Sequence, residues 1–287
     1  ELSYPADRFY VTDVFTDYAL EFLRQARATK DQPWFLYLAH SSPHFPVQAP
    51  KEAIDRHMAT YRRGWDVLRA ERFARMKALG LVAPDAALPP LSPVPVEADD
   101  AIANGFAGKP NPAWDSLPAD RREDLARRMA TFAAMVERID QGVGRLLADL
   151  ERNGELANTL VVFTSDNGCA PTVDVAGLEA MGHFPSGPLR GYKADAWEGG
   201  HRVPFIARWP AQVRPGVATA TVSQCDLLAT CAALLGVTLP KDAGEDSFSF
   251  LPVLTGAEVV SDELGVSLEK SGLDVLGQAK QITISKD

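Results

Sequence analysis

Four polar side chains of this 287-residue sequence lie in loops next to apolar segments, three just after such a segment and one before, where they could do chemistry together. Asp166 and Asn167 follow the apolar run 161–163 and offer a carboxylate and an amide carbonyl, the hard oxygen ligands that Ca²⁺ or Mg²⁺ takes. His44 lies between two prolines behind another apolar run, and a histidine with so restrained a backbone suits a proton donor or an oxyanion ligand. Lys193 could place a point charge on a tetrahedral anion.

Each of the four residues also has a plainer interpretation. Asp-Asn-Gly at 166–168 is a common turn sequence. A single histidine in a loop is commonly only a hydrogen-bonding group, and most lysines are exposed to solvent. Their order along the chain and their positions at the ends of predicted strands favour the chemical interpretation when the four are taken together.

Helices and apolar strands alternate along the chain. Apolar residues recur at helical spacing over residues 13–28, and the continuous apolar run 34–39 predicts a strand buried on both faces. The clearest helical pattern covers residues 125–150 and stops at Asn153-Gly154. The remaining predicted elements are a helix near 65–79, strands at 159–163 and 203–208, and a helix near 226–235 closed by Gly236. The alternation predicts an α/β sheet covered on both faces, and such sheets bind ligands beyond the carboxyl ends of their strands, where Asp166 and Asn167 fall.

Composition narrows the class of protein. The chain is 46% hydrophobic and 23% charged, as soluble globular proteins are, and its net charge of −9 argues against a nucleic-acid partner. Its apolar runs are far shorter than the ~20 residues of a membrane span, and no signal-peptide pattern opens the chain. Cys169, Cys225 and Cys231 are too few for a disulfide framework and lack the spacing of metal ligands.

The sequence resembles the type I sulfatases of the alkaline phosphatase superfamily, bacterial arylsulfatases especially, from about residue 10 to residue 256. The matching segments occur in family order: 11–13, 35–39, 43–46, 135–140, 158–168, 189–193 and 197–204. The resemblance implies the α/β fold of that superfamily, a mixed and mostly parallel sheet sandwiched by helices, in incomplete form. It also implies a partial catalytic domain at 1–256 with an irregular, Pro-rich excursion at 61–118.

The resemblance implies a role for each candidate residue. Asp166 and Asn167 match two ligands of an active-site Ca²⁺ or Mg²⁺. His44 matches the histidine that contacts the sulfate and protonates the leaving oxygen, and Lys193 matches a lysine that steadies the sulfate oxygens. The family's nucleophile is a formylglycine made from Cys or Ser. The implied activity is the hydrolysis of small-molecule or carbohydrate sulfate esters, and a periplasmic or secreted location is implied for the full-length protein.

The sequence departs from the family in its first half. No Cys/Ser-x-Pro-Ser-Arg segment occurs, and Cys169-Ala170-Pro171 continues to Val173 where the family has Arg, so we expect Cys169 to be a loop residue. The family's paired N-terminal aspartates, its motif arginine and its first lysine–histidine set are also missing. We therefore expect an N-terminally truncated sulfatase, inactive alone. A phosphate or phosphonate ester hydrolase of the same superfamily and a non-catalytic protein retaining the fold stay open as alternatives.

The last segment differs in character from the rest. Residues 257–287 resemble a piece of the group I chaperonin apical domain, which would join the sulfatase-like part at 254–256. The residues themselves predict a short helix near 261–264 and an alternating strand at 281–285, with too few apolar side chains for a separate core. We expect a fused or mis-assembled segment without chaperonin function, its strand either docked on the sheet or mobile.

Overall fold

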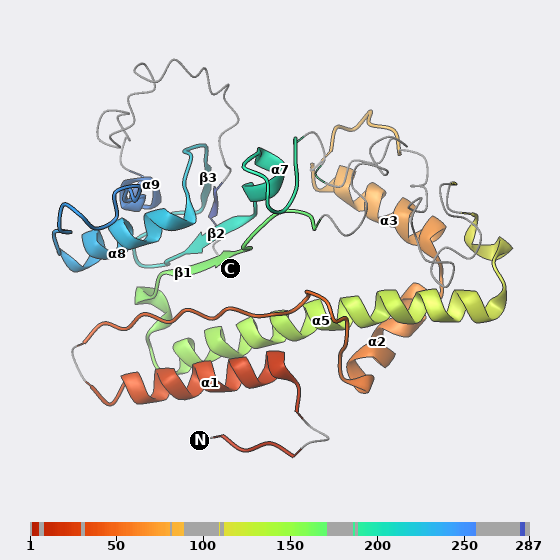
Figure 1. The fold of residues 1–287 in the computed structure, drawn as a ribbon, viewed down its shortest axis with the longest axis horizontal. Coiled ribbons are helices and arrows are strands. Elements are labelled where there is room, and N and C mark those ends of the chain that lie inside the picture. Colours follow the sequence, from red (N-terminus) through yellow and green to blue (C-terminus); the bar gives the residue numbers. More distant parts are fainter. Residues whose placement is uncertain are drawn as a thin grey trace. The chain divides into compact units, whose positions relative to one another are not determined.

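The computed structural model describes residues 2–5, 9–29, 32–80, 82–88, 109, 112–170, 186 and 189–256, and the backbone of residues 282–284. The chain divides into two compact units. The first unit is Glu1–Asn153 with Ala176–His183, and the second is Gly154–Val175 with Phe184–Asp287. The positions of the two units relative to one another are not determined (Figure 1).

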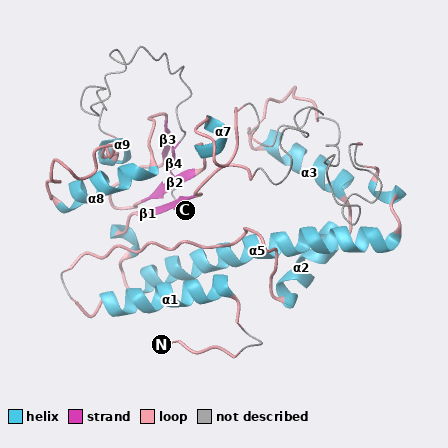
Figure 2. Ribbon diagram, in the orientation of Figure 1, coloured by secondary structure: helices cyan, strands magenta, loops and turns pink. Residues whose placement is uncertain are grey.

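The regular elements in the described part of the first unit are all helices, joined by loops (Figure 2). Its elements are α1 (Val11–Ala26), α2 (Lys51–Tyr61), α3 (Trp65–Ala78), the short 3-10 turn η2 (Trp114–Ser116) and the long α5 (Ala119–Arg152). Helix α2 packs against α5, and Met58, Ala126 and Ala130 belong to the buried cluster between them. None of the described helices is both long enough and apolar enough to cross a bilayer.

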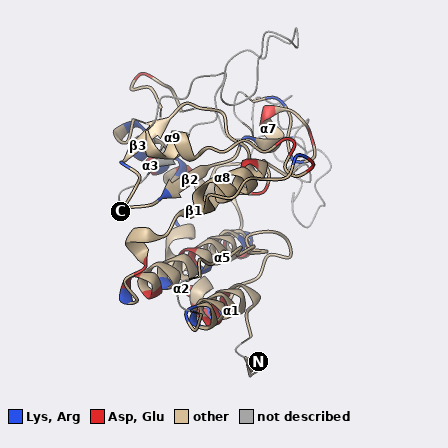
Figure 3. Ribbon diagram, turned by 90° about the vertical axis from the view of Figure 1, so that its left-hand side faces the viewer, with Lys and Arg blue, Asp and Glu red and all other residues tan. Residues whose placement is uncertain are grey.

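Helix α1 lies against the second half of α5. The two helices approach closely at Gly142, which has no side chain. A Cβ added there would lie only 2.5 Å from the Thr16 hydroxyl. Ion pairs also join them: Arg138 contacts Asp13 through two nitrogens, and Arg27 lies 2.7 Å from Asp149. The hydrogen-bonded Asp13 carboxylate raises the pKa of Arg138. Acidic and basic residues accordingly alternate along the ribbons of these helices (Figure 3).

The second unit contains a small mixed sheet. Its strands are β1 (Val161–Thr164), β2 (Phe205–Arg208), β3 (Gly216–Ala218) and β4 (Ile282–Ile284), in the order β1-β2-β4-β3. Strands β1 and β2 pair antiparallel, β2 and β4 parallel, and β3 and β4 antiparallel. The described helical segments of this unit are η3 (Leu156–Asn158), α7 (Glu198–His201), η5 (Gln224–Asp226), α8 (Leu227–Leu235) and α9 (Leu251–Thr255).

The core of the second unit lies on one face of this sheet. Phe205 and Ala207 alternate along β2 and are buried, as expected for strand residues that point to the same side. The rings of Phe205 and Phe250 meet edge to face, with 5.6 Å between their centroids. Phe250 and Leu254 are each only 1% exposed, so Leu254 of α9 and the residue just before this helix lie at the centre of the apolar cluster.

Most predicted elements are confirmed. Helices α1, α3, α5 and α8 and strands β1 and β2 lie where the patterns place them, and β4 shows that the predicted strand at 281–285 docks on the sheet. The α/β class is confirmed. Among the described strands, however, one of three pairings is parallel, whereas a mostly parallel sheet was expected.

The prediction of a buried strand at 34–39 is wrong. Residues 32–41 form neither helix nor strand, and the side chains of Phe35 and Tyr37 are 72% and 80% exposed. A strand requires ladder hydrogen bonds from a neighbour, and no strand in the described ranges pairs with this segment. Apolar composition alone therefore did not produce a strand here. The helix predicted near 261–264 lies outside the described residues.

Candidate active site

The loop after β1 carries the predicted metal ligands and is held at three points. The Thr164 hydroxyl donates to the Pro204 carbonyl at 2.9 Å, and the Gly168 amide donates to the Gly200 carbonyl, also at 2.9 Å. Between these two anchors, Nε2 of Gln224 donates to the Ser165 carbonyl at 2.6 Å. Asp166 is exposed at the turn of this loop, and Asn167 is partly buried.

The segment that carries Lys193 folds back onto this loop. The Lys193 amide donates to the Cys169 carbonyl at 2.8 Å, two residues beyond Asn167. A tight turn follows, in which the Asp195 carboxylate accepts from the Tyr192 amide at 3.0 Å and the Asp195 amide donates to the Tyr192 carbonyl at 2.9 Å. Lys193 is partly buried. The backbone thus brings Lys193 beside the Asp166-Asn167 loop.

Glycines make this close approach possible. A Cβ added at Gly168 would lie 1.9 Å from the Gly199 carbonyl oxygen, and one at Gly199 would lie 2.0 Å from the Gly191 oxygen. Gly191 has a φ of +83°, in the left-handed region that glycine adopts without strain. The glycines of 168, 191 and 199 therefore allow three stretches of backbone to lie at van der Waals contact.

The loop after β1 suits a hard cation in chemistry but is short of ligands. Nδ2 of Asn167 donates to the Gly168 carbonyl at 3.1 Å, which fixes the side-chain amide and leaves Oδ1 as the atom able to bind a cation. The Asp166 carboxylate is exposed and adds oxygens of the kind that Ca²⁺ prefers. Within the described ranges no group of three or more His, Cys, Asp or Glu side chains could hold a metal, whereas Ca²⁺ takes about six to eight oxygens. These two residues therefore fit as part of a ligand set.

His44 lies in the first unit, in a turn closed by its amide, which donates to the Ser41 carbonyl at 3.0 Å. Its Nδ1 lies 2.8 Å from the Phe45 carbonyl oxygen. Because a carbonyl can only accept, Nδ1 carries a proton. The turn is tied to α1, since the buried Ser42 hydroxyl lies 2.5 Å from the Thr12 hydroxyl. The structure places Asp166, Asn167 and Lys193 together and leaves the position of His44 relative to them undetermined.

Cys169 has the environment of a loop residue. It is partly buried, and burial raises the pKa of its thiol. A raised pKa lowers the thiolate fraction near neutral pH, which is the reverse of what an activated nucleophile requires. The backbone carbonyl of Cys169, by contrast, accepts the hydrogen bond from the Lys193 backbone amide. The backbone of Cys169 thus helps to join the two site loops.

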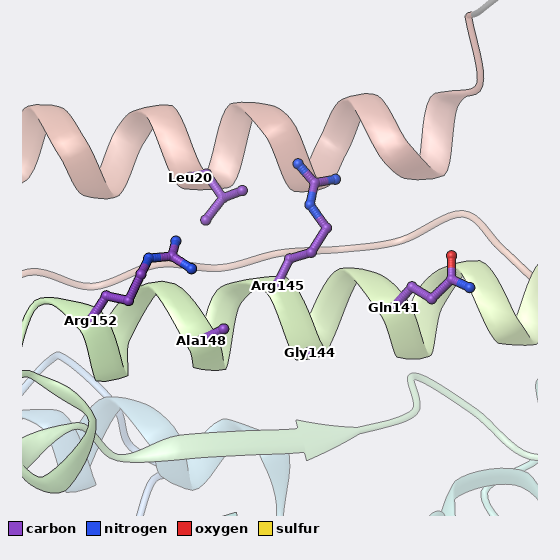
Figure 4. A pocket seen from close by; sticks show the side chains of 6 residues that line it. All are labelled: Leu20, Gln141, Gly144, Arg145, Ala148 and Arg152. Atoms are coloured by element: carbon purple, nitrogen blue, oxygen red, sulfur yellow. The ribbon is translucent and has the colours of Figure 1, made fainter.

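A shallow groove of about 640 Å³ lies between α1 and α5 in the first unit, and none of the predicted site residues lines it. Figure 4 shows Arg145 reaching toward α1 and Arg152 reaching toward Leu20 across it. Both guanidinium groups already contact carboxylates, Arg145 that of Asp17 and Arg152 that of Asp149. The groove therefore offers no unpaired charge from these two arginines.

Sequence reasoning missed Gln224, which contacts the residue before Asp166. It lies about sixty residues further along the chain, at the start of a helix, and belongs to no short motif. The only sequence signal near it is Ser223 with Asp226 three residues later, a pattern that marks a helix start.

Comparison with known proteins agrees with this geometry. The family model described as sulfatase matches residues 2–237. An uncharacterized sulfatase of Schizosaccharomyces pombe is 33% identical over 83% of this chain and 46% of its own length. The arylsulfatase of Klebsiella aerogenes is 35% identical over 58% of the chain and 32% of its own length. The N-acetylgalactosamine-6-O-sulfatase of Bacteroides thetaiotaomicron is 38% identical over 54% of the chain and 31% of its own length. The chain thus spans from about a third to about half the length of these relatives.

Solved structures show the same fold. The crystal structure of Ps i-CgsB in complex with k-i-k-neocarrahexaose has a TM-score of 0.50 and 28% identity, covering 85% of this chain and 38% of that one. The phosphonate monoester hydrolase SpPMH from Silicibacter pomeroyi shares the fold at a TM-score of 0.50 and 22% identity, over 88% of this chain and 42% of that one. With the family match and the loop geometry, the chain belongs to the sulfatase family, within the alkaline phosphatase superfamily.

Proposed function

We propose that this chain carries part of the active site of a sulfuric ester hydrolase acting on small-molecule or carbohydrate sulfate esters. The observation that carries the proposal is the pairing of two loops by the Gly168–Gly200 and Cys169–Lys193 hydrogen bonds. This pairing sets a lysine beside a carboxylate–amide pair at the end of a strand. Support also comes from relatives named arylsulfatase and N-acetylgalactosamine-6-O-sulfatase.

Each residue has a part in the proposed site. The oxygens of Asp166 and Asn167 would hold Ca²⁺ or Mg²⁺, and a bound dication stabilises negative charge on the transferring sulfate group. The Lys193 ammonium would bind the sulfate oxygens as a second positive charge. His44 would deliver a proton from Nε2 to the leaving oxygen, because its Nδ1 is occupied by the Phe45 carbonyl.

The first test of this function measures sulfate binding by Lys193. Titration with 4-nitrophenyl sulfate is expected to shift the backbone amide signals of residues 166–169 and 189–193. Lys193→Ala is expected to weaken binding about tenfold, the effect of losing a charged hydrogen bond. Lys241→Ala is the matched control, because Lys241 is an exposed lysine of the same unit. Equal affinity in the two variants would contradict the proposed role of Lys193.

The proposed nucleophile, formylglycine, has no source motif in the printed sequence, since Cys/Ser-x-Pro-Ser-Arg does not occur. We accordingly expect this chain by itself to release no 4-nitrophenol from 4-nitrophenyl sulfate, with Ca²⁺ or Mg²⁺ present. Absorbance of 4-nitrophenolate measures the rate, and Lys193→Ala, purified in parallel, reveals any contaminating sulfatase. Turnover by the wild-type chain that Lys193→Ala abolishes would overturn this expectation.

A further inference from the structure

Gln224 contacts the loop that carries Asp166 and Asn167, called the metal-ligand loop below, through the backbone of the preceding residue. It lies in η5, on an element separate from both site loops, and its Nε2 donates to the Ser165 carbonyl at 2.6 Å. The same nitrogen lies 3.5 Å from the Thr164 hydroxyl. These two residues directly precede Asp166, so a glutamine from a different part of the chain meets the loop just before its first ligand.

The backbone that carries Gln224 is itself fixed. One oxygen of the buried Asp226 carboxylate accepts from the Ser223 amide at 2.6 Å, and the other accepts from the Phe248 amide at 2.9 Å. The Ser247 hydroxyl donates to the Cys225 carbonyl at 2.7 Å. The residues on both sides of Gln224 are therefore fixed, Ser223 to Asp226, and Cys225 and Asp226 to the segment 247–248, which lies close in sequence to the buried Phe250 of the core.

We propose that Gln224 is a positioning residue for the Asp166-Asn167 pair, an inference that rests on the proposed function of that pair. The Ser165 carbonyl belongs to the peptide group that leads into Asp166. Fixing the direction of this carbonyl restricts the plane of that peptide and hence the position of the Asp166 Cα, from which the side chain leaves the backbone. Ligands must be held within about half an ångström of their working positions. The Thr164–Pro204 and Gly168–Gly200 hydrogen bonds hold the ends of the loop, and Gln224 holds its middle.

Amide hydrogen exchange tests the contact in the chain as it exists. Gln224→Met keeps the length of the side chain and removes the donor. Exchange of the Gly168 amide is expected to become roughly three- to tenfold faster, the effect of losing one hydrogen bond from a local opening. Exchange at Ala207, in the middle of β2, should stay unchanged. Gln212→Met is the matched control, since Gln212 is an exposed glutamine of the same unit. Unchanged exchange at Gly168 in Gln224→Met would overturn the proposal.

A Ca²⁺ titration separates positioning from a purely structural role. Ca²⁺ is followed through the side-chain amide signals of Asn167, with wild-type affinity expected on the order of millimolar. Gln224→Met and Gln224→Glu should both weaken binding at least twofold, because both lack the donor, although the glutamate adds a charge that would attract Ca²⁺. Tighter binding by Gln224→Glu would overturn the positioning role. A Ca²⁺ response that survives Asp166→Asn would instead contradict the proposed metal pair, and the exchange measurement would still decide whether Gln224 orders the loop.

Discussion

Gly168→Ala is expected to destabilise the second unit by about 3 kcal/mol, at the upper end of the cost of overpacking a tight site. The new Cβ would lie 1.9 Å from the Gly199 carbonyl oxygen and 2.9 Å from its carbonyl carbon. Both are backbone atoms, which cannot rotate away as the end of a flexible side chain could. The φ of Gly168 is not in the left-handed region, so the cost arises from contact alone.

The backbone at Gly199 is held in place and cannot move away to relieve this clash. Gly199 is buried, and its amide donates to the Arg190 carbonyl at 2.7 Å. A shift of Gly199 toward Gly191 is blocked, because even a Cβ there would lie 2.0 Å from the Gly191 oxygen. Relief of the clash therefore requires breaking the hydrogen bond from Gly168 to Gly200, and with it the contact between the two site loops.

Urea unfolding followed by circular dichroism measures the effect of Gly168→Ala. Gly216→Ala is the matched control, since Gly216 lies in β3 with nothing within 4 Å of an added Cβ, and we expect a change of no more than about 0.5 kcal/mol there. Binding of 4-nitrophenyl sulfate should also weaken in Gly168→Ala, because the loop of Lys193 loses its anchor. Equal stability of the two alanine variants would show that the loops are less closely packed than the structure indicates.

The fold was predictable wherever local patterns matched tertiary contacts. The apolar spacing of 125–150 and the stop at Asn153-Gly154 correspond to α5, which ends at Arg152, and to a φ of +71° at Gly154. Helix α8 likewise ends at Gly236, in the left-handed conformation. In these elements the apolar pattern, the helix end and the packing agree, and such agreement makes a local prediction reliable.

The prediction failed where the outcome depends on partners distant in the sequence. Residues 34–39 read as a buried strand, yet Phe35 and Tyr37 are largely exposed, since burial needs a neighbouring strand that the apolar run cannot specify. Helix α2 was not predicted, because residues 51–61 are mostly polar. Ala53 and Met58 nevertheless supply the buried face that packs on α5.

The candidate site was predictable in its short motifs and unpredictable in its supports. Asp166 and Asn167 could be named because they directly follow a predicted strand, and Lys193 because it lies in a short segment that matches the resembled family. The contact between them depends on hydrogen bonds between Gly168 and Gly200 and between Cys169 and Lys193, which no periodicity expresses. Gln224 was missed for the same reason: its partner is a backbone carbonyl, so no side-chain pattern marks the pair.

Asp226→Ala is expected to cost about 3 kcal/mol of unfolding free energy, because it removes both acceptors of a buried carboxylate. The Asp226 side chain is 7% exposed, and its oxygens accept from the Ser223 and Phe248 amides. The Ser223 and Phe248 amides would each be left without this acceptor, and η5 would lose the capping box that the carboxylate completes with Ser223.

Urea unfolding of three variants gives the test of Asp226. Asp226→Asn keeps the volume and one acceptor oxygen, so about half of the loss is expected, since hydrogen bonds to a neutral group are weaker than those to a carboxylate. Asp242→Ala, at an exposed aspartate of the same unit, should change stability by no more than about 0.5 kcal/mol. Equal stability of Asp226→Ala and Asp242→Ala would contradict the role of the carboxylate.

The same variants probe the link between Asp226 and the metal-ligand loop. If Asp226 acts on that loop by fixing the backbone of Gln224, Asp226→Asn should speed exchange of the Gly168 amide in the wild-type background. It should add little once Gln224→Met has removed the contact with Ser165, because residues that act in one network are not additive. Full additivity of the two substitutions would instead mean that Asp226 stabilises the start of α8 without helping to hold Asp166 and Asn167 in place.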